Sequence, residues 1–281
     1  MTDTNNPLLR ARGAAENNSA DLQERNRQWW EHLPMTYADW DSDERLPQTV
    51  EDYLQIEKTL LEASPFLRER YDFSQAKGLT MLEIGCGSGA LSCRFAREGA
   101  QITAVDITDA AVAMTQRNAD IQNVSLTVQQ EDAEKLSFSD NSFDYVFSWG
   151  VLHHTSDMDQ AFREVARVLK PGGRGLAMVY YRPSVAYYVH GLYWLLIKGK
   201  LFQGDTIHTV QRHYTDGYHH RYLTKSEMKD VLGLAGLKTH AQIVTQYQKK
   251  ILPLIPKFLD EFLKNHFGMC LITEFEKSRS Q

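Results

Sequence analysis

The amino-acid sequence predicts an α/β protein with a doubly wound, mostly parallel sheet and helices on both of its faces. From Leu79 onward, short apolar runs alternate with amphipathic segments of helical periodicity. The chain has 281 residues, of which 42% are hydrophobic, enough for one large domain with additions. Strands that alternate with helices are joined by right-handed crossovers, and this connection makes neighbouring strands parallel.

The expected elements follow from this alternation. Five strands are predicted first, at residues 80–84, 101–105, 124–129, 143–147 and 175–180. The helices between them are expected at residues 90–98, 109–120 and 157–169. Thr224 and Glu227 then form a capping-box pattern that opens a helix ending near Gly236. Two later strands are expected at 238–246 and 269–276.

The same pattern divides the chain into five parts. We expect a flexible N-terminal arm because the first residues are polar and bury little apolar surface. The arm covers residues 1–28, an aromatic, helical lid covers 29–78, and the sheet core covers 79–180. An irregular insertion on the substrate side follows at 181–223. The C-terminal part, 224–281, completes the core and has a helical insertion of its own at 251–267.

Composition excludes several classes of protein. Lys and Arg number 31 against 36 Asp and Glu, and the net charge of −5 argues against a nucleic-acid partner. Three separated cysteines do not form a disulfide framework. The first residues lack the apolar core of a signal peptide, and the longest apolar stretch, 185–197, is too short to span a bilayer. We therefore expect a cytoplasmic protein with no transmembrane segment.

A glycine-rich loop follows the first predicted strand of the core. Gly85, Gly87 and Gly89 lie between a strand and a helix, where glycines permit a tight turn and a close approach of ligand to backbone. An ordinary strand–helix turn is one interpretation. A dinucleotide-binding loop is another, because Gly85, Gly87 and Ala90 have the spacing of that fingerprint. The loop by itself does not separate these alternatives.

Two carboxylates beside the loop favour a different ligand. Glu83 precedes Gly85 by two residues, where it would repel a pyrophosphate and attract an ammonium group. Asp106 ends the second predicted strand, 21 residues after Gly85, and suits a bidentate hydrogen bond to ribose hydroxyls. The alternative for Asp106 is to cap the helix that begins near Asp109.

Six segments, taken together, resemble a known family. They are LEIGCGSG (82–89), VD (105–106), EDAE (131–134), SFDYV (142–146), VLHH (151–154) and LKPGG (169–173). In this order they resemble the class I S-adenosylmethionine-dependent methyltransferases, in the branch that includes the C-methyltransferases of ubiquinone and menaquinone biosynthesis. The resemblance covers residues 79–180, about a third of the chain. It implies a Rossmann-like sheet of seven strands with the last antiparallel, and S-adenosylmethionine as the cofactor.

The resemblance assigns the methionine end of the cofactor to a first group of residues. Glu83 and the backbone of Gly85, Gly87 and Gly89 would hold the methionine moiety. Ser148, just after the fourth strand, would line the same end of the pocket.

The ribose and adenine are assigned to a second group. Asp106 would bind the ribose, and Ile107 would pack against the adenine face. Asp132 would meet the adenine amino group, with the backbone amide of Ala133 at the ring. The alternative for Asp132 is a solvated acid on a loop.

One catalytic residue is predicted. Transfer to a hydroxyl or a protonated amine is helped by a nearby base, and histidine suits that work near neutral pH. His153 and His154 follow the fourth strand, and His153 is the first candidate. A purely structural role for this pair stays open. No metal site is expected, because His208, His219 and their neighbours lack the short ligand spacing of zinc motifs.

The substrate side is read from two aromatic segments. Tyr37, among tryptophans at 29, 30 and 40, is expected to reach the methionine carboxylate from a lid, or else these rings anchor the segment to the core. The apolar stretch 185–197 suits an acceptor pocket or peripheral contact with a membrane surface. It also suits packing on the domain or on the second subunit of a homodimer.

Together these features predict transfer of a methyl group from S-adenosylmethionine to a small, partly apolar metabolite at O, N or C. A nucleotide-dependent oxidoreductase is the first alternative, disfavoured by Glu83. A nucleic-acid or protein methyltransferase is another, and SWGV at 148–151 lacks the Asn/Asp-Pro-Pro-Tyr type of motif found in such enzymes. A non-catalytic regulator that binds S-adenosylmethionine is the third.

Overall fold

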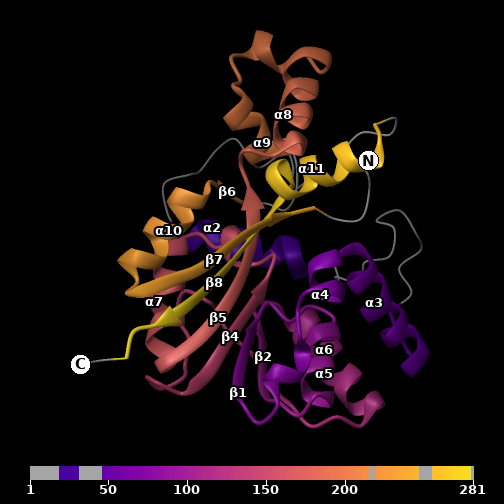
Figure 1. The fold of residues 1–281 in the computed structure, drawn as a ribbon, viewed down its shortest axis with the longest axis vertical. Helices are drawn as coiled ribbons and strands as arrows, with labels where there is room; N and C mark the ends of the chain where they lie inside the picture. The colour runs from indigo at the N-terminus through magenta and orange to yellow at the C-terminus, as the bar shows by residue number, and fades with distance from the viewer. Residues whose placement is uncertain (1–18, 32–45, 215–218, 247–254, 280–281) are drawn as a thin grey trace.

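A computed structural model describes residues 19–31, 46–214, 219–246 and 255–279 of the chain (Figure 1). Its centre is a sheet in the order β3-β2-β1-β4-β5-β8-β7, with the short β6 paired to β5. The strands are β1 (Thr80–Ile84), β2 (Gln101–Asp106), β3 (Thr127–Gln130), β4 (Phe143–Trp149), β5 (Leu169–Tyr181), β6 (Tyr222–Leu223), β7 (Leu237–Thr245) and β8 (Cys270–Lys277).

The sheet confirms the predicted fold class. Strands β1 to β6 pair in parallel, whereas β8, the last strand in the chain, is antiparallel to both of its neighbours β5 and β7. The antiparallel strand therefore lies inside the sheet, between β5 and β7. The order reverses at β1, which has β2 on one side and β4 on the other, and ligands bind beyond the carboxyl ends of strands at such a switch point.

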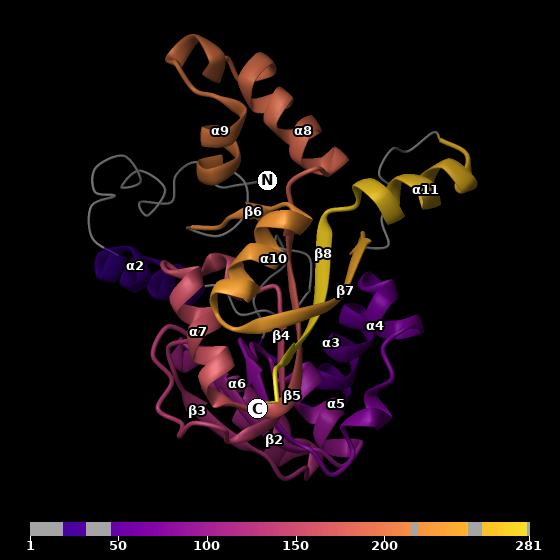
Figure 2. The ribbon, with the colours of Figure 1, turned by 60° about the vertical axis from the view of Figure 1, so that its left-hand side comes forward.

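The helices of the core cover both faces of this sheet (Figures 1 and 2). Strand residues alternate between the two layers: Leu82 and Val146 pack with α7 and α10, and Met81 and Phe147 pack with α3 to α6. The core helices are α3 (Val50–Ala63), α4 (Pro65–Glu69), η2 (Phe73–Ala76), α5 (Ala90–Arg97), α6 (Asp109–Gln122), η3 (Leu152–His154), α7 (Met158–Val168) and α10 (Lys225–Leu234).

Local sequence signals set several helix ends. Thr224 and Glu227 form the expected capping box at the start of α10, and Thr49 and Asp52 form a second one at α3. The proline–glycine segment 171–173 lies within β5. It forms a bulge there, since Phe143 pairs with Leu169 and Tyr145 with Arg174.

The N-terminal segment is also different from the flexible arm expected over 1–28. Residues Ser19–Glu31 form helix α2, and the side chains of Gln23 and Asn26 are buried. Both make hydrogen bonds to residues more than a hundred positions away in the chain. Such partners cannot be inferred from the composition of the segment, which by itself is typical of a solvated arm.

Beyond the carboxyl end of β5, the insertion projects away from the sheet (Figures 1 and 2). It consists of α8 (Val185–Leu192), the π-helical turn η4 (Tyr193–Ile197), η5 (Lys200–Gln203) and α9 (Ile207–Tyr214). Between β7 and β8, where a helical insertion was expected at 251–267, α11 spans Lys257–Phe267. No helix in the described ranges is long and apolar enough to cross a membrane.

Candidate functional site

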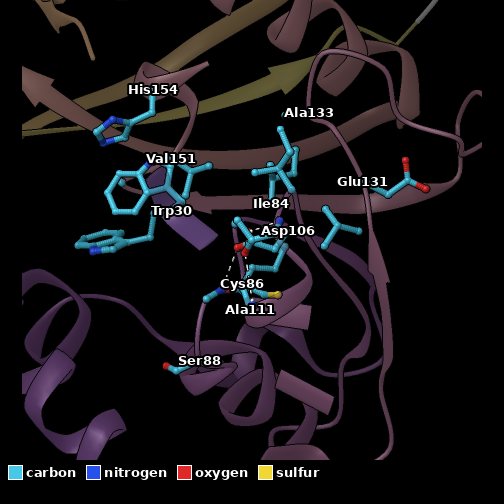
Figure 3. A pocket seen from close by; sticks show the side chains of 18 of the residues that line it. Trp30, Ile84, Cys86, Ser88, Asp106, Ala111, Glu131, Ala133, Val151 and His154 are labelled. Carbon is cyan, nitrogen blue, oxygen red and sulfur yellow. Dashed lines mark hydrogen bonds between the residues drawn. The ribbon is translucent and has the colours of Figure 1, made fainter. Parts of the chain in front are cut away.

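A pocket lies beyond the carboxyl ends of β1, β2 and β4, beside helix α2 (Figure 3). The loops after these three strands and the buried side of α2 supply its walls. Among the residues predicted from sequence, the following line it: Glu83, Gly85, Gly87, Asp106, Ile107 and Ala133. The structure thus brings together residues that are up to fifty positions apart in the chain.

The glycine loop holds its backbone against the pocket. The amides of Gly85 and Cys86 donate to the carbonyl of Val105, at 2.8 and 3.0 Å, and tie the loop to the end of β2. Gly85 has φ of +82°, and a Cβ there would lie 2.1 Å from Cγ2 of Val151. No side chain fits at this position, so bare backbone faces the pocket. Gly89 is the N-cap of α5 and does not line the pocket.

Glu83 lines the pocket and is only 3% exposed. The Ser92 hydroxyl donates a hydrogen bond to its carboxyl group. Burial, with a smaller contribution from the nearby Asp106, raises the pKa of Glu83 to about 8, and the Ser92 bond opposes the shift. A cationic partner would favour the ionised form of this buried carboxyl group.

Asp106 organises the loop rather than the next helix. Its Oδ2 accepts from the Gly87 amide at 3.1 Å, and its Oδ1 accepts from the amide and hydroxyl of Thr108 at 3.1 and 2.9 Å. Thr108 is the residue that caps α6, so the helix-capping alternative for Asp106 does not apply. Burial raises the pKa of Asp106 against these hydrogen bonds. A carboxylate oxygen has two lone pairs and can accept more than one hydrogen bond, and the Asp106 side chain lines the pocket (Figure 3).

The part of the pocket wall beside the end of β3 combines apolar side chains with one acid. Ile107 and Ala133 line it together with Glu131. Asp132 does not line this pocket but an adjoining open groove. Its Oδ1 accepts from Nε2 of Gln23 at 2.8 Å and from the Glu134 amide at 2.9 Å.

One other predicted residue lies outside the pocket wall. Ser148 is buried behind the loop, and its hydroxyl donates to the carbonyl of Ile84 at 3.1 Å. Its neighbours Trp149 and Gly150 line the pocket instead. Tyr37 lies outside the described residues.

The two histidines after β4 have different surroundings. His153 is completely buried, with ring centroids of His154 and Tyr180 each at 4.2 Å, and no hydrogen-bond partner for either ring nitrogen among the described residues. Burial chiefly, and then positive neighbours such as His154 and His220, hold the pKa of His153 well below its ordinary range. His153 does not line the pocket, whereas His154 does.

A hydrogen bond to the backbone of His219 orients His154. Its Nδ1 lies 2.8 Å from the carbonyl oxygen of His219. A carbonyl only accepts, so Nδ1 carries the hydrogen, and in the neutral ring the lone pair is at Nε2. The ring of Trp30 meets His154 edge-on, with centroids 5.0 Å apart. This geometry gives His154 the form of a base at the pocket wall.

Helix α2 supplies pocket residues that the sequence interpretation missed. Gln23, Asn26 and Trp30 all line the pocket. Gln23 also accepts from the Ser156 amide at 3.1 Å, and Asn26 donates to the His154 carbonyl at 2.8 Å. Glu31 accepts from the amides of residues 109 and 110 at the start of α6. The polar sequence of α2 gave no signal for these roles.

No group of three or more His, Cys, Asp or Glu side chains that could hold a metal ion lies within the described ranges. The three cysteines are buried and are not joined by disulfides.

Comparison with known proteins agrees with this site. Residues 82–177 match the family described as a methyltransferase domain. The ubiquinone biosynthesis O-methyltransferase of Coxiella burnetii is 32% identical over 98 residues, 35% of this chain and 42% of that protein. A ubiquinone/menaquinone biosynthesis C-methyltransferase of Pseudomonas putida is 33% identical over 139 residues, 46% of this chain and 54% of that protein. The chain spans about half the length of these curated relatives.

Solved structures share the fold. An S-adenosylmethionine-dependent methyltransferase from Mesorhizobium loti is 21% identical with a TM-score of 0.52, and covers 76% of this chain and 96% of its own. The magnesium protoporphyrin IX methyltransferase of Synechocystis PCC 6803 is 17% identical with a TM-score of 0.54, and covers 90% and 98%. These likenesses concern the architecture alone. Residues 82–177 thus match a methyltransferase domain, and the fold is that of S-adenosylmethionine-dependent methyltransferases of known structure.

Proposed function

We propose that the protein transfers a methyl group from S-adenosylmethionine to a small, partly apolar metabolite in the pocket beside α2. One observation carries this proposal: a single pocket is lined by the buried carboxyl group of Glu83 at the end of β1, the carboxyl group of Asp106 at the end of β2 and the apolar Ala133 after β3, and these three strands are neighbours in that order in the sheet. An ammonium group, a ribose and an adenine ring follow one another in the same order along the cofactor.

Each pocket residue has a role in this proposal. Glu83 holds the ammonium group, and the bare backbone at Gly85 and Gly87 lets the methionine end approach closely. Asp106 accepts hydrogen bonds from the ribose hydroxyls. Gly89 acts through the shape of the loop, because its φ of +74° starts α5.

At the adenine end, Ile107 and Ala133 contact the ring, and the Ala133 amide is the proposed donor to it. Asp132 is the proposed partner of the adenine amino group and reaches it only by exchanging its bond to Gln23. Ser148 supports the methionine end from behind, through its bond to the Ile84 carbonyl.

When bound, S-adenosylmethionine supplies a methyl group on a positively charged sulfur. The chain's own contribution is to orient the two reactants and to exclude water from between them. His154 is the group placed to accept a proton from an acceptor, through Nε2, because Nδ1 donates to the His219 carbonyl. His153, the candidate predicted first, packs behind His154 and supports its ring.

Two features favour a small acceptor. Helix α2 covers the pocket with Gln23, Asn26 and Trp30, which narrows access for a polymer. The relatives reported above are named for the biosynthesis of quinones, which are small molecules with apolar parts. An oxidoreductase that binds a dinucleotide is disfavoured, since the buried Glu83 would meet a pyrophosphate with its carboxyl group.

The test combines product detection with cofactor binding. Incubation with isotopically labelled S-adenosylmethionine and a metabolite extract should give a labelled small molecule by mass spectrometry. Calorimetry with S-adenosylhomocysteine should show binding that Asp106→Ala weakens by about 1.5–3 kcal/mol, the contribution of hydrogen bonds to a charged group. Absence of binding by the wild-type protein would refute the methyl-transfer proposal, and unchanged affinity in the variant would remove Asp106 from the site.

A further inference from the structure

The insertion beyond β5 presents apolar side chains to solvent at regular spacing. On the continuous helical segment α8–η4 the outward residues recur every four positions, in two adjacent rows. Two more follow in η5. These side chains, called here the apolar tip, are Tyr188, Val189, Leu192, Tyr193, Leu196, Ile197, Leu201 and Phe202.

The tip is not the face by which the insertion packs. Tyr187 and Leu195 are buried on the other side of the segment, together with Gly191. A Cβ at Gly191 would lie 2.3 Å from Ile207 of α9, so the two helices are in close contact there. The helix is therefore apolar on two sides, and the described part of the chain covers only one of them. Ile197 is 74% exposed and Phe202 90% exposed.

Charge and aromatic content indicate what covers the other side. Residues 183–204 contain Lys198 and Lys200 and no Asp or Glu, in a chain of net charge −5. The Lys198 Nζ lies 5.7 Å from the Tyr193 ring centroid and 5.9 Å from that of Trp194. Apolar side chains bordered by tyrosine, tryptophan and lysine are typical of segments that lie in a membrane interface and contact anionic headgroups.

The place of the tip in the fold agrees with this occupant. Helices α8 and α9, which belong to the insertion, project from one end of the sheet and away from the core (Figures 1 and 2). A second copy of the chain docked symmetrically on the tip would bring Lys198 and Lys200 toward their own counterparts. We propose that the apolar tip docks this protein on the surface of an anionic lipid bilayer.

Vesicle flotation tests the proposal with the full chain. The wild-type protein should float with vesicles of equal parts phosphatidylcholine and phosphatidylglycerol, and more weakly with phosphatidylcholine alone. The double variant Ile197→Glu/Phe202→Glu should lose at least about tenfold in partitioning, because two apolar side chains leave the interface. The matched control is Leu234→Glu, on α10 far from the tip, where the leucine is 75% exposed. It should float as the wild type does.

A second variant separates charge from apolar contact. Lys198→Glu/Lys200→Glu should remove the preference for phosphatidylglycerol, because two positive charges beside the tip are replaced by negative ones. Failure of the wild-type protein to float with either vesicle would overturn the proposal. An equal loss of vesicle binding in Leu234→Glu would also overturn it. The same holds if sedimentation shows a wild-type dimer that is absent in the Ile197→Glu/Phe202→Glu variant, since a second copy would then cover the tip. None of these readouts depends on methyl transfer.

Discussion

Glu83 and Asp106 end neighbouring strands, and their carboxyl groups share one pocket although they are 23 positions apart in the chain. Parallel strands place their carboxyl ends at one edge of the sheet, which brings the two groups together. Their proximity and burial keep the pKa of Glu83 high. The chemistry of this site is therefore set by side chains whose charged forms disfavour each other until a cation binds.

Binding of the cofactor should therefore release a proton from Glu83. The pKa of Glu83 is about 8 without a cationic partner, so the carboxyl group is mostly protonated near neutral pH. An ammonium group favours the ionised form, so affinity for S-adenosylhomocysteine should rise with pH up to about 8 and then level off. Calorimetry at about pH 7 in buffers of different ionisation enthalpy measures the released proton. Glu83→Gln should bind more weakly and release none; equal release in that variant would contradict the assignment.

His153 should make stability depend on pH. Its pKa in the folded protein lies well below the ordinary 6.5, so the unfolded chain takes up a proton first as the pH falls. The stability that neutral His153 contributes is fully present above pH 6.5 and is lost progressively below it. When the pH falls to about one unit below that value, the free energy of unfolding of the wild type should decrease by about 1 kcal/mol. The free energy of unfolding of His153→Phe should not show this decrease. Urea unfolding at the two pH values measures the difference, and parallel losses would show that another group is responsible.

At the scale of elements, helix α2 is attached to the core by polar contacts. Gln23 bridges Asp132 and Ser156, Asn26 binds the His154 carbonyl, and Glu31 accepts from the first amides of α6. A carboxylate at a helix N-terminus is also favoured by the helix dipole. Because these contacts surround the pocket, α2 is placed to restrict exchange of a bound ligand.

Loss of the α2 contacts should weaken ligand binding. Gln23→Ala/Asn26→Ala removes two buried side-chain anchors, and we expect affinity for S-adenosylhomocysteine to fall by about 1–3 kcal/mol, with faster dissociation. Glu24→Ala is the matched control on the same helix, because Glu24 is exposed and pairs with Arg27 at the surface. Stopped-flow and calorimetric measurements compare the two. The same dissociation rate in both variants would argue against a covering role for α2.

At the scale of the whole molecule, the sheet order decides where the pocket lies. The strand order reverses at β1, which has β2 on one side and β4 on the other. The loops after these three strands line the pocket. The insertion with the apolar tip and helix α11 extend beyond the same end of the sheet (Figure 2). One end of the molecule thus carries both the pocket and the proposed membrane contact.

Ligand binding should stabilise the whole fold. S-adenosylhomocysteine at about one hundred times its Kd adds about 2.7 kcal/mol to the free energy of unfolding. For a domain of this size the melting temperature should rise by about 5–10 °C. NAD is the control ligand, and it should give no such rise because Glu83 disfavours a pyrophosphate. A larger shift with NAD would favour the oxidoreductase alternative.

The sequence was informative where structure depends on near neighbours. Strand β1 spans the residues predicted for it, and most helices end within a few residues of expectation, because apolar periodicity, caps and glycines act over one or two turns. The alternation of strands and helices also implied the parallel sheet. The carboxylate before the glycine loop, which we expected to face a ligand, lines the pocket.

Other features depend on contacts between distant segments, and only the tertiary structure decided them. Helix α2 forms against residues 109–156, and Asp132 is held by Gln23 at the edge of the pocket. His154 rather than His153 lines the pocket, because the short turn η3 directs adjacent side chains to different surroundings. By itself the sequence determined the fold class and the glycine loop with its carboxylates. Which side chains line the pocket was decided by packing, since burial and hydrogen-bond partners arise only when segments remote in sequence come together.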